Sequence, residues 1–241
     1  MKILNFTIEQ EVAGQISTIY PTVIKTENEV VLVDCGYEET FDQFKVELAK
    51  LGIPLTAITK IIISHDDIDH LGALPLFVAE NPDIQVYCST IEKSAVTGET
   101  KSERLEQAEA SLQQLPVEYR AWAENFIIRL NKIKRIPVDH TLEEGDYVVE
   151  EVEVIHTPGH TKGHISLFDH KTKTLIANDA LVIEEDRLNI ANPQFTLDMR
   201  QAVASLKKIK QLQPAKIICY HGGSMEEGIQ EQLEVVIQYY Q

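Results

Sequence analysis

The chain has 241 residues, which suits one large α/β domain or a domain with a sizeable insertion. Its net charge is −16, from 38 acidic and 22 basic residues, and this counts against a nucleic acid or an anionic membrane as partner. The three cysteines are far apart and form neither a disulfide framework nor a C-x-x-C metal knuckle. No segment has the apolar pattern of a signal peptide or of a membrane span. We expect a cytoplasmic protein that forms a single domain over residues 1–241.

The first part of the chain alternates apolar strands with helices. We predict strands at residues 3–6, 18–24, 30–33, 60–63 and 84–88. A helix over residues 40–51 is indicated by apolar residues on one face, and Gly52 ends it. A further helix follows the strand at 60–63 and ends near Asn81. This alternation is typical of the α/β fold class.

Residues 89–137 differ in character and form a predicted helical insertion. Apolar residues recur at helical spacing over residues 102–115 and again over 117–135, and Pro116 separates the two stretches. The favoured interpretation is that these faces pack in the core or at a dimer contact, because such stripes are common. The alternative is a lid in which aromatic residues such as Trp122 and Phe126 shape a substrate pocket.

The second part of the chain is again rich in strands. We predict strands at residues 147–149, 152–155, 165–168, 174–177 and 216–220. A polar loop is expected at 184–194, a helix at 197–212, and a final helix closes the chain. The loop and the insertion are the segments that we expect to shape a substrate site.

Residues that bind metals collect at the ends of these strands. The stretch His65-Asp66-Asp67-Ile68-Asp69-His70 follows the strand at 60–63, and its side chains would resist burial without a divalent cation. A solvated acidic turn is the alternative. Four other predicted strands, however, are also followed by an Asp or a His, namely Asp34, His160, Asp179 and His221. Because ligands of α/β proteins bind at the carboxyl ends of strands, we predict a metal site at that edge.

These motifs resemble those of metallo-β-lactamase-fold hydrolases, in particular the glyoxalase II and lactonase branches. Those branches carry H-x-H-x-D-H, a later His in P-G-H-T, an Asp, and a His followed by Gly. This chain has H-D-D-I-D-H at residues 65–70, T-P-G-H-T-K-G-H at 157–164, Asp179, and H-G-G from His221. The resemblance covers nearly the whole chain except the insertion. It implies a four-layer αββα sandwich that is interrupted by the helical insertion at 89–137.

The resemblance also implies a site for two metal ions. One ion would be bound by His65, Asp67 and His160, the other by Asp69, His70 and His221, and Asp179 would bridge them. Asp34 would orient the ligands, and His164 would form a structural hydrogen bond beside the site. The family usually has His where this chain has Asp67. Because a carboxylate is a harder ligand than imidazole, zinc is the first expectation and iron or manganese stays open.

The function implied by the resemblance is metal-dependent hydrolysis. A bridging hydroxide, activated by the metals, would attack the carbonyl of an ester, thioester or lactone, and Asp69 would orient the nucleophile or accept its proton. An alternative is a non-haem iron oxidoreductase acting on oxygen or a persulfide, which Asp67 favours and the lack of a flavin domain disfavours. A metal-stabilised binding module without turnover is a third hypothesis. We expect a small-molecule substrate, neither a nucleic acid nor a membrane as partner, and leave a homodimer open.

Overall fold

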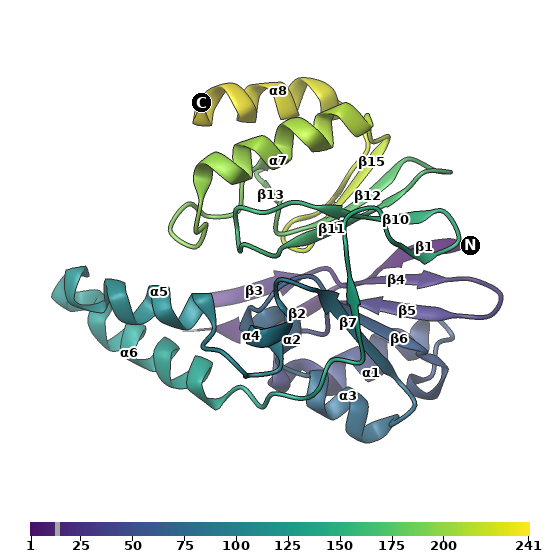
Figure 1. Ribbon diagram of the computed structural model, residues 1–241, viewed down its shortest axis with the longest axis horizontal. Coiled ribbons are helices and arrows are strands. Elements are labelled where there is room, and N and C mark those ends of the chain that lie inside the picture. The colour runs from purple at the N-terminus through teal and green to yellow at the C-terminus, as the bar shows by residue number, and fades with distance from the viewer. Residues whose placement is uncertain (13–14) are drawn as a thin grey trace.

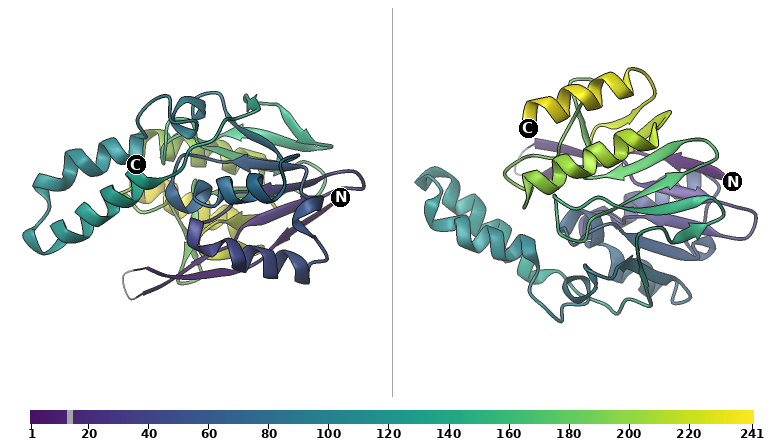
Figure 2. Two further views of the ribbon diagram at one scale, coloured as in Figure 1. Left: turned by 90° about the horizontal axis from the view of Figure 1, so that it is seen from below. Right: turned by 45° about the horizontal axis from the view of Figure 1, so that its top comes forward.

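Two β-sheets pack face to face, and helices cover both outer sides (Figures 1 and 2). A computed structural model describes residues 1–12 and 15–241. In the first sheet the strand order is β1 (Lys2–Asn5), β4 (Thr22–Lys25), β5 (Val30–Val33), β6 (Lys60–Ile63), β7 (Gln85–Ser89) and β8 (His140–Leu142). In the second sheet it is β16 (Gly223–Met225), β15 (Lys216–Cys219), β12 (Thr174–Asn178), β11 (Ile165–Asp169), β10 (Val152–His156) and β9 (Tyr147–Val149).

Strands β5 and β6 are covered on both faces, and this explains why each is an unbroken apolar run. Val31 and Ile62 belong to the core between the two sheets, together with residues of the second sheet. Leu32 and Ile61 pack instead against the outer helices. From β5 to β8 the strands of the first sheet run parallel, so their carboxyl ends lie at one edge.

The outer layers are formed by two pairs of helices. Helices α1 (Phe41–Lys50) and α3 (Leu74–Glu80) cover the first sheet, where the rings of Phe44 and Phe77 meet edge to face with centroids 5.5 Å apart. Helices α7 (Met199–Leu212) and α8 (Ile229–Tyr240) cover the second sheet, and Leu206 of α7 and Leu233 of α8 are fully buried. The layers are therefore α, β, β and α, and the predicted sandwich is confirmed.

The insertion leaves the sandwich between β7 and β8. It contains α4 (Lys93–Val96), α5 (Glu103–Ser111) and α6 (Val117–Lys132). Helices α5 and α6 form a hairpin that projects from the body at the left of Figure 1. The first part of the predicted apolar stripe lies outside the core, since Tyr119 is 57% and Trp122 is 45% exposed. None of the helices in the described residues combines the length and the apolar character that crossing a membrane would need.

Two predicted segments differ from the structure. The expected strand at 18–24 is interrupted at Pro21, which has no N–H for a ladder, and forms β3 (Gln15–Ile19) and β4 instead. Strand β3 pairs with β2 (Ile8–Val12). The expected polar loop at 184–194 begins in a hairpin of β13 (Val182–Glu184) and β14 (Arg187–Asn189). Its turn residues Glu185 and Asp186 both have positive φ, which favours Asn or Gly, so the sequence carried no hairpin signal.

Candidate metal centre

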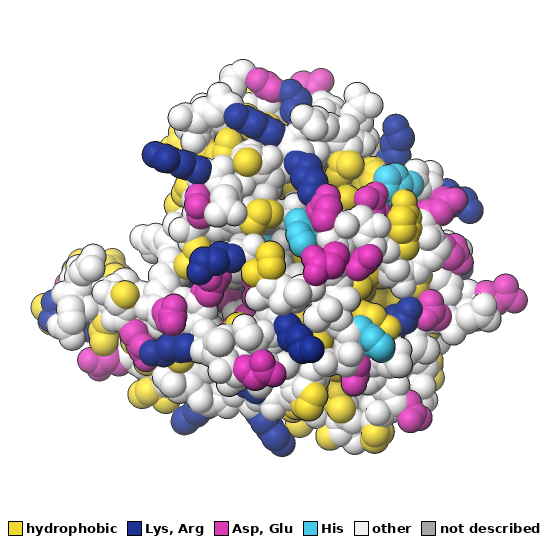
Figure 3. Space-filling model, viewed as in Figure 1, with side chains coloured by type: hydrophobic (Ala, Val, Ile, Leu, Met, Phe, Trp, Pro, Cys, Tyr) yellow, Lys and Arg dark blue, Asp and Glu magenta, His cyan; other side chains and the backbone are white. Residues whose placement is uncertain are grey.

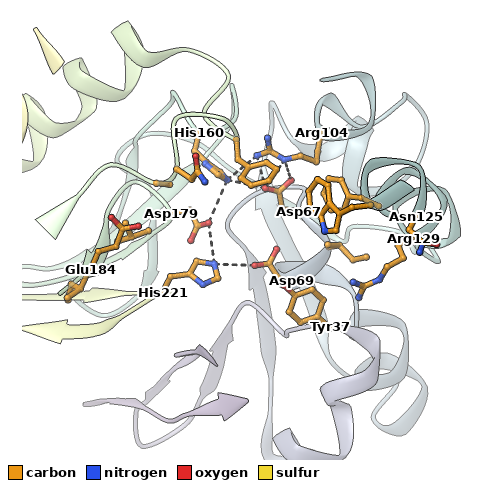
Figure 4. A pocket seen from close by; sticks show the side chains of 18 residues that line it. Tyr37, Asp67, Asp69, Arg104, Asn125, Arg129, His160, Asp179, Glu184 and His221 are labelled. Atoms are coloured by element: carbon orange, nitrogen blue, oxygen red, sulfur yellow. Dashed lines mark hydrogen bonds and ion pairs between the residues drawn. The ribbon is translucent and has the colours of Figure 1, made fainter. Parts of the chain in front are cut away.

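The predicted ligands lie together where strands of both sheets end, and Figure 4 shows Asp67, Asp69, His160, Asp179 and His221 among them. The segment after β6, with the short helix α2 (Ile68–Leu71), supplies residues 65–70. His160 lies between β10 and β11, Asp179 follows β12, and His221 follows β15. Donor atoms within 4.8 Å of one another form three sets, which are His65, Asp67 and His160; His65, His70 and Asp179; and Asp69, His70 and His221. We call the first set the Asp67 subsite and the third set the Asp69 subsite.

Asp34 is fully buried and forms hydrogen bonds to residues of the site. Its carboxylate accepts hydrogen bonds from Ser64 N at 2.8 Å, from Ser64 Oγ at 2.7 Å and from His70 Nδ1 at 2.8 Å. Because the Ser64 hydroxyl donates to Asp34, it accepts from His65 Nδ1 at 2.9 Å. Both imidazoles therefore carry a proton on Nδ1, and in its neutral form each ring presents the lone pair of Nε2 to the site. The resemblance implied that Asp34 orients ligands, and in the structure it contacts His70 directly and His65 through Ser64.

The centre contains buried donor atoms that lack protein partners. Nε2 of His65, Nε2 of His70 and Oδ1 of Asp179 have no hydrogen-bond partner among the described residues. Such an atom costs about 1–3 kcal/mol when nothing satisfies it. Asp179 Oδ2 lies 3.5 Å from Nε2 of His70 and 3.6 Å from Nε2 of both His160 and His221. This central carboxylate and the open imidazole nitrogens fit a divalent cation.

The charges of the Asp69 subsite also favour a cation. Burial alone lowers the pKa of His70, but Asp179 and Asp34 outweigh it and raise the pKa well above its usual range. The pKa of His221 is raised in the same way, because Asp179 and Asp69 overcome the effect of burial. Against burial, His221 and His70 hold the pKa of Asp179 well below its usual value. The carboxylates remain ionised, and the subsite stabilises positive charge.

Arg104 on α5 reaches the Asp67 subsite, a contact that sequence reasoning missed. Its Nε donates to Asp67 Oδ1 at 2.8 Å and its Nη2 donates to Oδ2 at 2.8 Å. The Arg104 side chain is only 2% exposed. Burial would raise the pKa of Asp67, but Arg104 together with His160 holds it well below its usual range. An arginine on a surface helix normally faces solvent, so the sequence carried no signal for this contact.

Glu92, just before α4, was also missed and connects the insertion to two ligand loops. Its carboxylate accepts hydrogen bonds from Thr161 Oγ1 at 2.6 Å, from Gly163 N at 2.9 Å and from Asp66 N at 3.1 Å. Burial raises the pKa of Glu92, and the hydrogen bond from Thr161 opposes that shift. This side chain fixes the loop of His160 relative to the loop of residues 65–70.

His164 lies beside the site, and its ring contacts the backbone N–H of Asp179. Its Nε2 accepts from Asp179 N at 3.1 Å, so its Nδ1 donates to Thr157 Oγ1 at 2.8 Å. Burial, with the neighbouring His65, lowers the pKa of His164 well below its usual range, which keeps the ring neutral. His170 lies elsewhere, at the surface, where its Nε2 pairs with Glu153.

A cavity of about 600 Å³ opens above the ligands. Its floor contains Asp67, Asp69, His160, Asp179 and His221. Helix α6 supplies one wall through Trp122 and Phe126, whose rings are stacked with centroids 5.4 Å apart and an interplanar angle of 12°. The ring of Phe195, in the segment that follows β14, faces the ring of Phe126, and their centroids are 6.3 Å apart. The insertion therefore forms part of the cavity, as Figure 4 shows for Asn125 and Arg129 of the same helix.

Comparisons with known proteins agree with this architecture. The sequence model of the Metallo-beta-lactamase superfamily matches residues 17–221. The chain is similar to the Probable metallo-hydrolase YflN of Bacillus subtilis (strain 168), with 26% identity over 225 residues, 86% of this chain and 81% of that protein. It is 35% identical to an N-acyl homoserine lactonase of Bacillus sp over 95 residues, 37% of this chain and 38% of that one. The crystal structure of metallo-beta-lactamase family protein TTHA1429 from Thermus thermophilus matches with a TM-score of 0.71 and 18% identity, over 99% of this chain and 79% of that one.

Proposed function

The chain belongs to the metallo-beta-lactamase superfamily, and we propose that it is a metal-dependent hydrolase of small esters, thioesters or lactones that carry an apolar acyl group. One observation carries this proposal. The floor of a cavity with aromatic walls contains Asp69, Asp179 and His221, and the carboxylate of Asp179 there has an oxygen without a protein partner and lies 3.5 Å from the unpartnered Nε2 of His70. Such a floor fits a metal ion, and such walls fit the apolar part of a substrate.

The chain's own residues prepare the site for hydrolysis. A bound divalent ion polarises a carbonyl oxygen and lowers the pKa of water. Asp69 faces the cavity, with Oδ2 3.2 Å from His221 Nε2, and its backbone carbonyl accepts a hydrogen bond from Tyr220 Oη at 2.7 Å. Against burial, His70 and His221 lower the pKa of Asp69, so its carboxylate is ionised near neutral pH. We propose that Asp69 accepts the proton of the attacking water.

The substrate class follows from the cavity walls and the overall charge. The rings of Trp122, Phe126 and Phe195 offer an apolar surface beside the ligands, and we propose that α6 acts as a lid over an acyl group. One relative is named as a lactonase of N-acyl homoserine lactones, compounds that join an acyl chain to a lactone. A small molecule also suits a net charge of −16 and a face on which acidic and basic side chains are interspersed (Figure 3).

Zinc is the metal that we propose first. The Asp69 subsite offers two imidazoles and a carboxylate beside Asp179, a donor set that zinc accepts. The alternative of an iron oxidoreductase depended on Asp67 as a metal ligand. Both carboxylate oxygens of Asp67 bond to Arg104, so the contacts of the described residues do not favour that alternative.

The test is a substrate panel on protein loaded separately with Zn²⁺, Mn²⁺ and Fe²⁺. The panel contains p-nitrophenyl acetate and octanoate, an octanoyl thioester, and γ-lactones with and without an N-acyl group. We expect hydrolysis of at least one class, with octanoyl preferred over acetyl compounds.

Two variants connect the activity to the site. Asp179→Ala should lose bound metal and activity together. His170→Ala, which removes a surface imidazole paired with Glu153, should keep both. Metal-loaded protein that hydrolyses nothing on the panel, or a fully active Asp179→Ala, would overturn the proposal.

A further inference from the structure

The guanidinium of Arg104 is held in a defined position beside the Asp67 subsite. Besides its hydrogen bonds to Asp67, its Nη1 donates to Gln107 Oε1. Gln107 in turn donates from Nε2 to the backbone oxygen of Gln194 at 3.0 Å. Arg104 Cζ lies 5.4 Å over the ring of Phe195. A bidentate ion pair, a supporting amide and an aromatic face together form a site built for this cation.

Whether the Asp67 subsite can bind a metal while Arg104 is in place depends on His160. A neutral imidazole has one nitrogen with a lone pair, and that lone pair either accepts a hydrogen bond or binds a metal. Nη2 of Arg104 is only a donor, and it lies 3.1 Å from His160 Nε2. Asp67 Oδ2 lies 3.0 Å from the same nitrogen, so Nε2 either accepts from Arg104 or, in the other tautomer, donates to Asp67, and in both cases it offers no lone pair to a metal. Arg104 therefore competes with a metal ion for two of the three donor residues of this subsite.

The Asp69 subsite differs in this respect. Asp69 pairs with His221 and His70, and Asp179 pairs with those histidines and with His160. Within the described residues, neither carboxylate forms an ion pair with a lysine or an arginine. A metal ion therefore meets carboxylates that pair with histidines at the Asp69 subsite, and a carboxylate that pairs with a permanently charged arginine at the Asp67 subsite.

We propose that Arg104 takes the place of one of the two metal ions expected at this centre. A single divalent ion binds tightly at the Asp69 subsite with Asp179, and the guanidinium supplies the positive charge at the Asp67 subsite. This inference rests on the proposed metal-dependent function. Arg104 also lines the cavity, so a substrate oxygen on that side meets a guanidinium from the insertion. Displacing α5 would open the Asp67 subsite to a second ion.

The experiment counts metal ions per chain and does not depend on activity. Wild type, Arg104→Gln and Arg129→Gln are equilibrated with excess Zn²⁺, freed of loosely bound ions, and measured by elemental analysis. Arg129 is the matched control, because it lines the same cavity but pairs with Glu39 and not with a metal-binding residue. We expect one ion in wild type and Arg129→Gln, and two in Arg104→Gln.

The affinity of the second ion should rise at least about 100-fold in Arg104→Gln, because a fixed positive charge that contacts two of the ion's donor residues is removed. If the unpaired Asp67 prevents that variant from folding, the double variant Arg104→Gln, Asp67→His leaves no buried carboxylate unpaired and should also hold two ions. Two tight ions in wild type, or one ion in every folded Arg104 variant, would overturn the inference and leave the hydrolase proposal standing. Wild type that binds no ion would overturn both, whereas a one-ion protein without hydrolase activity would overturn only the proposed function.

Discussion

Replacing Asp34 with asparagine should weaken metal binding although Asp34 is not itself among the metal ligands. Asparagine keeps the size of the side chain and tolerates the φ of 58° at this position. One of its terminal atoms, however, becomes an NH₂ donor. Where that donor faces His70 Nδ1, this nitrogen has to accept, and the ring proton moves to Nε2. The lone pair that should bind the metal is then lost.

The structure sets the size of this effect. Replacing an outer partner of a metal ligand typically costs 10–100-fold in affinity, equivalent to about 1.4–2.8 kcal/mol. The Asp34 carboxylate also accepts hydrogen bonds from Ser64 N, Ser64 Oγ and His70 Nδ1. Because a hydrogen bond to a charged group contributes about 1.5–3 kcal/mol, the metal-free variant should lose about 2–3 kcal/mol of unfolding free energy.

Two assays measure these effects separately. Competition with a chromophoric chelator gives the Zn²⁺ dissociation constant, and urea unfolding of metal-free protein gives the stability. Asp42→Asn is the control, because Asp42 is 86% exposed and its ion pair among the described residues is with Lys45. A folded Asp34→Asn that binds Zn²⁺ within threefold of wild type would refute the assignment of Asp34 as the residue that sets the histidine tautomers.

Three further predictions address pH, stability and specificity. In metal-free protein, the raised pKa of His70 contributes stability that is fully present below about pH 6.5 and is lost as the pH rises through the pKa of His70 in the folded protein. A metal ion that binds His70 has to displace the proton that this raised pKa retains. Zn²⁺ affinity should therefore rise with pH, and calorimetry in two buffers of different ionisation enthalpy should detect proton release; absence of release would contradict this. Glu92→Ala should lose about 3 kcal/mol or more in urea unfolding, because it strands three donors, whereas Glu92→Gln should recover part of the loss. Trp122→Ala should raise KM for an octanoyl ester about tenfold and leave kcat for an acetyl ester unchanged, and Val117→Ala, at an exposed position of the same helix, should change neither.

The sequence by itself determined the fold class and predicted which metal-binding side chains would gather at one edge. Strands that are covered on both faces must be continuous apolar runs, so β5 and β6 could be recognised from composition alone. Metal-binding side chains after successive strands must meet where those strands end, and Asp179 and His221 do so. Both inferences rest on local pattern and on the geometry of parallel strands.

Only the tertiary structure decided what faces those ligands. Arg104 is 37 residues from Asp67 and 56 residues from His160, and its helix carries no periodic signal for either contact. The sequence predicted an insertion but not the direction of the α5–α6 hairpin, which brings Arg104, Trp122 and Phe126 to the cavity. That direction depends on contacts between segments far apart in the chain, such as Gln107 with Gln194 and Glu92 with Gly163. Such contacts leave no repeat or spacing in the sequence, because each is a single pairing that only the packed chain brings together.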